Sequence, residues 1–230
     1  MKVVILAGGY GTRISEYTKT IPKPMIKINN VPIIMHIINH YISYGHNDFY
    51  IALGYKGEVL KKYFKSLKRK NFKVNLIETG LKTMTGGRIK QIGKLLNGET
   101  FLATYGDGLS NVNIHKLIKF HQRNNKLLTM TAVRPPARFG SINFKGNNVS
   151  YFKEKSNLDE GWINGGYFVI NPKFLKYING NKTFLEKEPF EKLTKKRQLV
   201  GYKHRGFWQC MDTLRDKKIL ETRLKEKNLG

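Results

Sequence analysis

The sequence has one cysteine, few acidic residues and no long apolar run. The single cysteine, Cys210, excludes an internal disulfide and a zinc site built from cysteines alone. With one cysteine, the six histidines have no cysteine pair with which to form a mixed zinc site, so we expect no structural metal. No apolar run approaches the roughly 18 residues of a membrane span, and Met1 and Lys2 lead into a strand-like segment rather than a signal peptide. We therefore expect a cytoplasmic protein that does not bind membranes.

Acidic residues are scarce: 16 Asp plus Glu stand against 42 Lys plus Arg, a formal net charge of +26. Such a charge is typical of proteins that bind nucleic acid or another polyanion. The lysines are spread along the chain, however, and the dense basic clusters at 66–73 and 192–197 do not interleave aromatic residues as a stacking platform for bases does. We interpret most of the charge as compositional drift on a solvated surface and expect no specific nucleic-acid partner. A non-catalytic, basic regulatory or nucleic-acid-binding protein stays open as the alternative from another class.

Strand-like and helix-like patterns alternate through the first half of the chain. Strand-like segments at 3–7, 48–54, 73–79 and 100–108 are each followed by a helix-like segment, at 31–45, 57–67, 86–96 and 113–123. Four successive strand–helix units predict an α/β fold with a doubly wound, mostly parallel sheet covered by helices on both faces. Because the chain contains no linker and no internal repeat, we expect a single domain over residues 1–230.

Beyond residue 126 the pattern changes to shorter strand-like pieces. These lie at 127–133, 140–144, 149–154 and 163–170. We expect them to add strands, including a small sheet that forms one wall of a site. The final segment, from Asp212, has a capped helical pattern with charges of both signs, and Asp212 itself could be the N-cap of that helix.

A glycine-rich loop, LAGGYGTRISEYTKTIPKP at 6–24, follows the first strand. It is not a dinucleotide fingerprint, because Ile14 stands where the third glycine is needed, and it is not a P-loop, because Gly11 is not followed by Lys-Ser/Thr. A glycine-rich turn at the carboxyl end of a strand lets backbone amides approach an anion. Since Arg13 and Lys23 add two cations, we predict that this loop binds phosphate groups.

The motif GGYGTR followed by IPKPMIKI resembles the signature of the sugar-1-phosphate nucleotidylyltransferases. Further segments are similar, in order, to the cytidylyl branch of that family: MTGGRIK, TYGDGLSNVNI, RPPARFG, INGGYFV and FWQCMDTLRDK. The resemblance covers nearly the whole chain and implies a Rossmann-like, GT-A-like fold. It implies transfer of a cytidylyl group from CTP to glucose 1-phosphate, with release of pyrophosphate. The same reaction with UTP or dTTP, or with another sugar 1-phosphate, stays open.

The resemblance also implies which residues form the site. The nucleotide would be bound by Leu6, Ala7, Gly8, Gly9, Gly11, Thr12, Arg13, Thr83, Arg88 and Gly106. The sugar phosphate would be bound by Lys23, Phe139, Gly140, Glu154, Lys155, Asn164 and Gly165. Catalysis would rest on Arg13, Lys23 and Asp107, and Mg²⁺ would be held by Asp107 and Asp212.

These residue types suit phosphoryl-group chemistry. The nucleophile is a phosphate oxygen that is already anionic at neutral pH, so the reaction needs positioning and charge neutralisation instead of a general base. Mg²⁺ takes one or two protein carboxylates and leaves its other positions to water and phosphate, which fits Asp107 and Asp212. We expect Arg88 to donate to the triphosphate or to a pyrimidine carbonyl.

One departure from the family concerns assembly. Family members carry a longer segment between the helix that ends near Phe64 and the strand that begins at Lys73, and that segment is associated with subunit contacts. Here only KSLKRKNF connects the two. Because so short and basic a connection cannot reach another subunit, we expect a monomer or homodimer with a more open nucleotide site.

Overall fold

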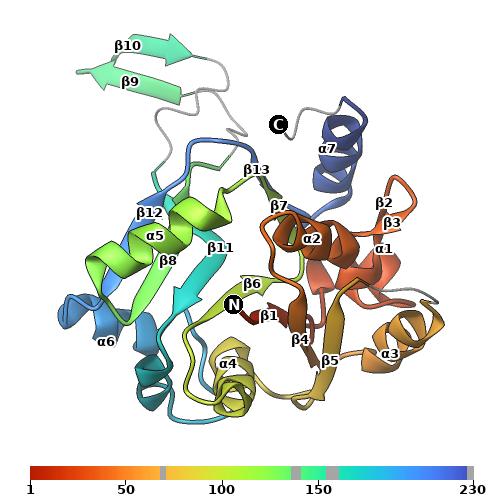
Figure 1. Ribbon diagram of the computed structural model, residues 1–230. Helices are drawn as coiled ribbons and strands as arrows, with labels where there is room; N and C mark the ends of the chain where they lie inside the picture. The colour runs from red at the N-terminus through yellow and green to blue at the C-terminus, as the bar shows by residue number, and fades with distance from the viewer. Residues whose placement is uncertain (68–70, 136–140, 154–160, 227–230) are drawn as a thin grey trace.

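The computed structural model describes residues 1–67, 71–135, 141–153 and 161–226. A seven-stranded sheet forms its centre (Figure 1). The strands are β1 (Val3–Leu6), β4 (Asp48–Leu53), β5 (Lys73–Glu78), β6 (Phe101–Tyr105), β8 (Leu128–Val133), β11 (Ile163–Ile170) and β12 (Leu199–Lys203). Their order in the sheet is β12-β8-β11-β6-β1-β4-β5, and only β11 runs antiparallel to its neighbours. The predicted α/β fold with a mostly parallel sheet is therefore confirmed.

Helices cover both faces of this sheet. They are α1 (Ser15–Thr18), α2 (Ile33–Ile42), α3 (Gly57–Ser66), α4 (Thr85–Gly93), α5 (Ile114–Asn124), α6 (Glu188–Lys195) and α7 (Leu214–Lys225). Val3 and Ile5 belong to one core with α2, α3 and α5, while Val4 belongs to a second core with α4 and α6. Because side chains alternate along a strand, β1 is buried on both faces, as expected for a parallel strand in the middle of a sheet. None of the helices within the described ranges is long and apolar enough to cross a bilayer.

The strand predicted at 100–108 is shorter than expected. It ends at Tyr105, the chain turns at Gly106 and Asp107, and a second short strand, β7 (Gly108–Ser110), pairs with β13 (Trp208–Cys210) outside the main sheet. The turn occurs where Gly106 passes close to Leu6, because a Cβ at Gly106 would lie 2.8 Å from the Leu6 carbonyl oxygen. The break therefore places Asp107 at the carboxyl edge of the sheet.

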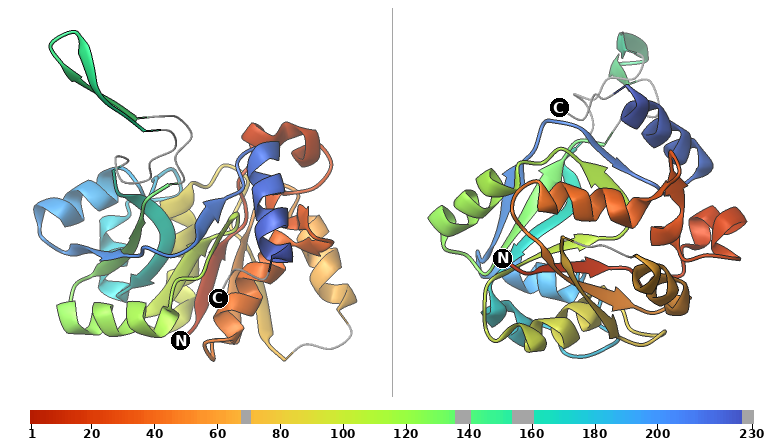
Figure 2. Two further views of the ribbon diagram at one scale, coloured as in Figure 1. Left: turned by 90° about the horizontal axis from the view of Figure 1, so that it is seen from above. Right: turned by 45° about the vertical axis from the view of Figure 1, so that its right-hand side comes forward.

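The predicted small sheet is a single hairpin. β9 (Ser141–Lys145) and β10 (Asn148–Lys153) pair antiparallel and stand away from the central sheet (Figure 2). The other two late segments, at 127–133 and 163–170, extend the central sheet as β8 and β11 instead. Most apolar residues of β8 and β11 are buried in the central sheet, which explains why these two strands join the main core rather than the hairpin.

Buried and half-buried histidines predict how stability depends on pH. Mainly through burial, the pKa values of His40, His121 and His204 are lowered, and that of His46 falls to about 4. Unfolded histidine titrates near about 6.5, so below that pH the unfolded chain binds protons that the folded chain does not. The free energy of unfolding should therefore decrease as the pH drops from about 6.5 towards 4, by up to about 2 kcal/mol for His46 alone.

Urea unfolding between neutral pH and about pH 5 measures this dependence. His46→Asn should make the curve flatter, because a titratable group that prefers the unfolded state is removed. Equal pH dependence in the wild-type and variant proteins would show that His46 does not contribute.

Candidate functional site

Four charged side chains meet where β1 and β6 end. Lys23 Nζ lies 2.7 Å from both Asp107 Oδ2 and Asp212 Oδ1. Arg13 Nη1 lies 2.6 Å from Asp212 Oδ2. The fold thus brings together all four residues that the sequence suggested for catalysis and metal binding, from three distant parts of the chain.

A short antiparallel ribbon aligns the two carboxylates. Gly108 in β7 pairs with Cys210 in β13, so Asp107 just before β7 and Asp212 just after β13 lie at the same end of the ribbon. The Met211 amide donates to the Asp107 carbonyl at 2.8 Å and closes that end. Lys23 reaches both carboxylates from the 3-10 helix η2 (Lys23–Met25), where proline on either side restricts the backbone.

The pKa shifts follow from this charge arrangement. Burial lowers the pKa of Lys23, but Asp107 and Asp212 outweigh burial, so the pKa of the amine is raised overall. Burial raises the pKa of Asp212, but Lys23 and Arg13 outweigh it and lower that pKa overall. Lys23 and Asp212 are therefore both charged at neutral pH. The Arg13 side chain is 73% exposed, so its guanidinium is accessible to an anionic ligand.

The two carboxylates suit Mg²⁺. Both supply hard oxygen donors, and two of their oxygens lie close enough to share one ammonium group. Within the described part of the chain no three His, Cys, Asp or Glu side chains form a metal-binding group. Water and the phosphates of a ligand would complete the coordination, as is usual for Mg²⁺.

The glycine-rich loop lies beside this charged cluster. The Gly8 carbonyl accepts from the Tyr55 amide at 3.1 Å, while Gly9 and Thr12 are exposed. Gly11 has φ +66°, and a Cβ there would lie 2.8 Å from Thr18 Cγ2, so both conformation and space require glycine. Leu6 ends β1, Ala7 follows it, and the Gly106 amide donates to the Leu6 carbonyl at 3.0 Å. The loop and the turn that carries Asp107 are therefore held together.

Arg88 lies beneath this loop rather than in an open position. It is 4% exposed, and its guanidinium donates to the Gly8 carbonyl at 2.9 Å, to the Leu53 carbonyl at 2.6 Å and to Thr79 Oγ1. We expected Arg88 to donate to a nucleotide, whereas here these donors bind the protein backbone and Thr79. The difference arises because α4 directs Arg88 towards the ends of β1 and β4. Thr83 is buried in the turn that precedes α4.

Two of the predicted sugar-side residues lie on β11. Asn164 Nδ2 donates to Tyr105 Oη at 3.0 Å, and Trp208 Nε1 donates to the Gly165 carbonyl at 2.7 Å. Both contacts connect β11 to segments that adjoin the carboxylates. The other predicted sugar-side residues, Phe139, Gly140, Glu154 and Lys155, lie outside the described residues.

Asp216 is a site residue that the sequence motifs did not indicate. Its Oδ2 accepts from the amides of Asp212 and Thr213, at 3.1 and 2.9 Å. Thr213, not Asp212, is the N-cap of α7, because its hydroxyl accepts from the Asp216 amide in a capping box. The spacing T-x-x-D could have revealed this cap. It leaves the Asp212 carboxylate available to Lys23 and Arg13.

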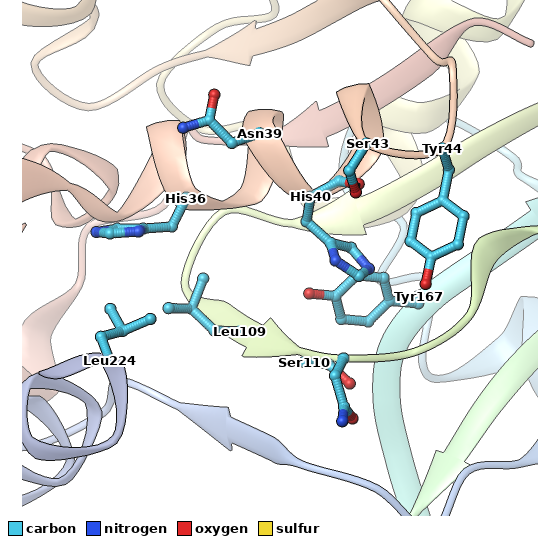
Figure 3. A pocket seen from close by; sticks show the side chains of 10 residues that line it. His36, Asn39, His40, Ser43, Tyr44, Leu109, Ser110, Tyr167 and Leu224 are labelled. Carbon is cyan, nitrogen blue, oxygen red and sulfur yellow. The ribbon is translucent and has the colours of Figure 1, made fainter. Parts of the chain in front are cut away.

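A cavity of about 320 Å³ lies against β7 and is also lined by α2 (Figure 3). Within it, the rings of His40 and Tyr167 meet edge to face, with 6.1 Å between centroids. Tyr167 Oη donates to the Gly108 carbonyl at 3.2 Å, next to Asp107. No charged residue of the cluster lines this cavity, so the cavity is separate from the cluster. Tyr167 connects the two, because its hydroxyl supports the backbone next to Asp107.

The reactivity of the Cys210 thiol tests how burial and negative charge act beside Asp212. Its Sγ lies 3.6 Å from Asp212 Oδ2, and burial, together with the neighbouring carboxylates, raises the pKa of the thiol to about 12. At about pH 8 the folded protein should therefore react with iodoacetamide at least about a hundredfold more slowly than the urea-unfolded protein, because the thiolate is the nucleophile. Mass spectrometry over time measures both rates, and comparable rates would contradict the expected shift.

Comparison with known proteins agrees with this geometry. The sequence profile described as nucleotidyl transferase matches residues 2–216. Glucose-1-phosphate cytidylyltransferase of Salmonella typhimurium is 42% identical over 243 residues, covering 96% of this chain and 95% of that protein. A probable glucose-1-phosphate cytidylyltransferase of Bacillus subtilis is 41% identical, covering 94% and 93%. The crystal structure of HddC from Yersinia pseudotuberculosis complexed with GMP-PN shares the fold, with a TM-score of 0.78 at 24% identity over 97% of this chain and 99% of that one.

Proposed function

The chain belongs to the nucleotidyl transferase family, and from this we propose that it transfers a cytidylyl group from CTP to α-D-glucose 1-phosphate. One observation carries the proposal: Arg13, Lys23, Asp107 and Asp212 converge at the carboxyl edge of the sheet. They do so in a chain that is 42% identical, over 96% of its length, to a glucose-1-phosphate cytidylyltransferase.

The reaction exchanges one phosphorus–oxygen bond for another. A phosphate oxygen of glucose 1-phosphate attacks the α-phosphorus of CTP, and the bond from that phosphorus to the β-phosphate oxygen breaks, so that pyrophosphate leaves with the electron pair. No proton has to be removed from the nucleophile. Arg13 and Lys23 bind the phosphate oxygens on which negative charge develops. When bound by Asp107 and Asp212, Mg²⁺ would supply further charge neutralisation.

The glycine-rich loop is the proposed site of the triphosphate. Gly9 and Thr12 are exposed, Gly11 permits the turn, and their backbone amides would donate to phosphate oxygens. Arg88 contributes by holding the Gly8 carbonyl from beneath, and its positive charge adds to the potential at the loop. Thr83 and Gly106 would border the nucleoside.

The sugar phosphate is proposed to lie between Lys23 and the start of β11. Asn164 would contact sugar hydroxyls, and Gly165 allows the strand to pass close to β8, since a Cβ there would lie 2.7 Å from Val133 Cγ1. Phe139, Gly140, Glu154 and Lys155 complete the proposed set.

We also propose that the protein works in the cytoplasm as a single-domain monomer or homodimer. The connection from α3, which ends at Ser66, to β5, which begins at Lys73, is short. The match to the Salmonella protein spans 243 residues against the 230 of this chain, so that relative contains residues without a counterpart here. Light scattering at working concentration tests the proposal, and a stable hexamer would refute it.

A pyrophosphate-release assay tests the reaction itself. CTP, UTP, dTTP and GTP are each combined with a panel of sugar 1-phosphates in the presence of Mg²⁺. The highest kcat/KM is expected for CTP with glucose 1-phosphate, by at least about tenfold over the other nucleotides. A clear preference for another nucleotide or sugar would replace the proposed specificity, and the absence of any release would refute the activity.

A further inference from the structure

A chain of hydrogen bonds crosses the site from α4 to β11. Thr85 Oγ1 donates to Glu186 Oε2 at 2.7 Å, and Tyr105 Oη donates to Glu186 Oε1 at 2.5 Å. Asn164 Nδ2 in turn donates to Tyr105 Oη at 3.0 Å. Neither Tyr105 nor Glu186 belongs to the charged cluster, yet together they link the segment proposed for the nucleotide to the strand proposed for the sugar.

Donor and acceptor chemistry allows only one direction along this chain. A carboxylate can only accept, so the Tyr105 hydroxyl must donate to Glu186 and can offer only its lone pairs to Asn164. The Asn164 amide must therefore present its nitrogen to Tyr105. Its oxygen accepts from the Gly166 amide at 2.9 Å. Glu186, acting through Tyr105, and the Gly166 amide thus together set which way round the Asn164 amide lies.

Tyr105, the middle residue of this chain of hydrogen bonds, is held in place by packing. The Tyr105 ring packs edge to face on Phe168, with 5.6 Å between centroids, and it also packs against the backbone of Gly166. Gly166 has φ +77°, and any Cβ there would overlap the Tyr105 ring, so this close approach requires glycine. Burial and the nearby Glu186 charge raise the pKa of Tyr105 far above its usual value, and the hydroxyl stays protonated.

The Thr85 end of this chain of hydrogen bonds is also anchored. Thr85 is the first residue of α4, and its Oγ1 accepts from the Leu185 amide at 2.9 Å. The segment that carries Glu186 is therefore fixed to the start of α4. A side-chain amide has two N–H groups, and within the described residues Asn164 donates to Tyr105 alone. The second N–H is available to a ligand.

We propose that Glu186, acting through Tyr105, is a positioning residue that turns the Asn164 amide so that it donates a hydrogen bond to a hydroxyl group of the sugar 1-phosphate. This inference rests on the proposed function, because that function places the sugar beside Asn164. A reversed amide would present an oxygen in place of the N–H, and the Glu186 carboxylate, through Tyr105, opposes that reversal together with the Gly166 amide.

The test compares Glu186→Gln, Tyr105→Phe and the double variant with a matched control. Glutamine can donate to Tyr105, so that the Tyr105 hydroxyl no longer has to accept from Asn164 and the hold on the amide weakens, and phenylalanine removes the link with little change in shape. Each single variant should raise KM for glucose 1-phosphate about tenfold, while KM for CTP changes less than about twofold. Because both changes break the same chain of hydrogen bonds, KM for glucose 1-phosphate in the double variant should be no higher than in the more affected single variant.

Glu188→Gln is the control, since Glu188 lies two residues further on and pairs with Lys192 and Asn179 at the surface. Its KM values should match those of the wild type. Equal increases in both KM values together with a lowered Tm would indicate a merely structural role, and additive effects in the double variant would show that the two residues act separately. Either result would overturn the proposal.

The wild-type assay separates this inference from the proposed function. If the wild type used a different sugar 1-phosphate, the proposed specificity would fail, and the variants would be measured with that sugar, for which the same selective rise in KM is expected. If no sugar 1-phosphate reacted, calorimetric binding of glucose 1-phosphate to the wild type and to the four variants would replace KM. Unchanged binding in Glu186→Gln would then refute the positioning role.

Discussion

Replacing Asp107 by asparagine is expected to lower kcat about a thousandfold while the protein stays folded. The change keeps the volume of the side chain but removes one of the two negative charges that Lys23 contacts. It also removes one of the two oxygen donors suited to Mg²⁺. Pyrophosphate release measures the loss of activity, and circular dichroism with a thermal melt checks the fold.

Asp48→Asn is the matched control for this prediction. Asp48 begins β4 and accepts a hydrogen bond from Asn75 Nδ2 at 2.9 Å, so it is an aspartate with a partner outside the charged cluster. Its replacement should leave kcat within about twofold of the wild type. Near wild-type activity in a folded Asp107→Asn protein would remove Asp107 from the catalytic set.

Replacing Gly8 by alanine is expected to raise KM for CTP more than about tenfold and to lower the free energy of unfolding by about 3 kcal/mol. A Cβ at Gly8 would overlap the Arg88 guanidinium, which is buried and donates to the carbonyls of Gly8 and Leu53. Moving that guanidinium would take a buried charge away from its hydrogen-bond acceptors. The loop proposed for the triphosphate would lose its support from beneath.

Gly9→Ala is the internal control, because a Cβ at Gly9 would meet no heavy atom within 4 Å. It should fold with wild-type stability and change KM for CTP much less than Gly8→Ala does. Urea unfolding and steady-state kinetics of both variants decide the matter. Equal effects at the two positions would mean that the loop, and not its contact with Arg88, sets nucleotide binding.

The contrast between Arg88 and Lys23 shows where sequence reasoning succeeds. Lys23 lies between two prolines in a motif that resembles a known family, and in the structure it lies beside Asp107 and Asp212, which the sequence indicated for the same site. Arg88 stands in an equally recognisable motif, but which way it faces depends on how α4 packs on the sheet. A motif identifies the type of residue that a site needs, whereas packing decides whether that residue faces the ligand or supports the residues that do.

The succession of elements and the chemistry of the site could be predicted from the sequence. The alternation of strands and helices could be predicted because apolar periodicity depends on residues only a few positions apart. The glycine-rich loop at 6–24 and the surroundings of Asp107 and Asp212 indicated phosphate chemistry for the same reason, since each is a local pattern. The capping box at the start of α7 is equally local and could have been predicted.

Which residues meet depends on how the whole chain folds. Lys23 lies 84 and 189 positions from its two carboxylate partners, and Asn164 lies 59 positions from Tyr105. The insertion of β11 between β6 and β8, the end of β6 at Tyr105 and the contact of Glu186 with Tyr105 were likewise not predicted. These pairings depend on the order of strands and on which face each helix covers, and burial of the whole sheet sets both, so no short stretch of sequence contains them.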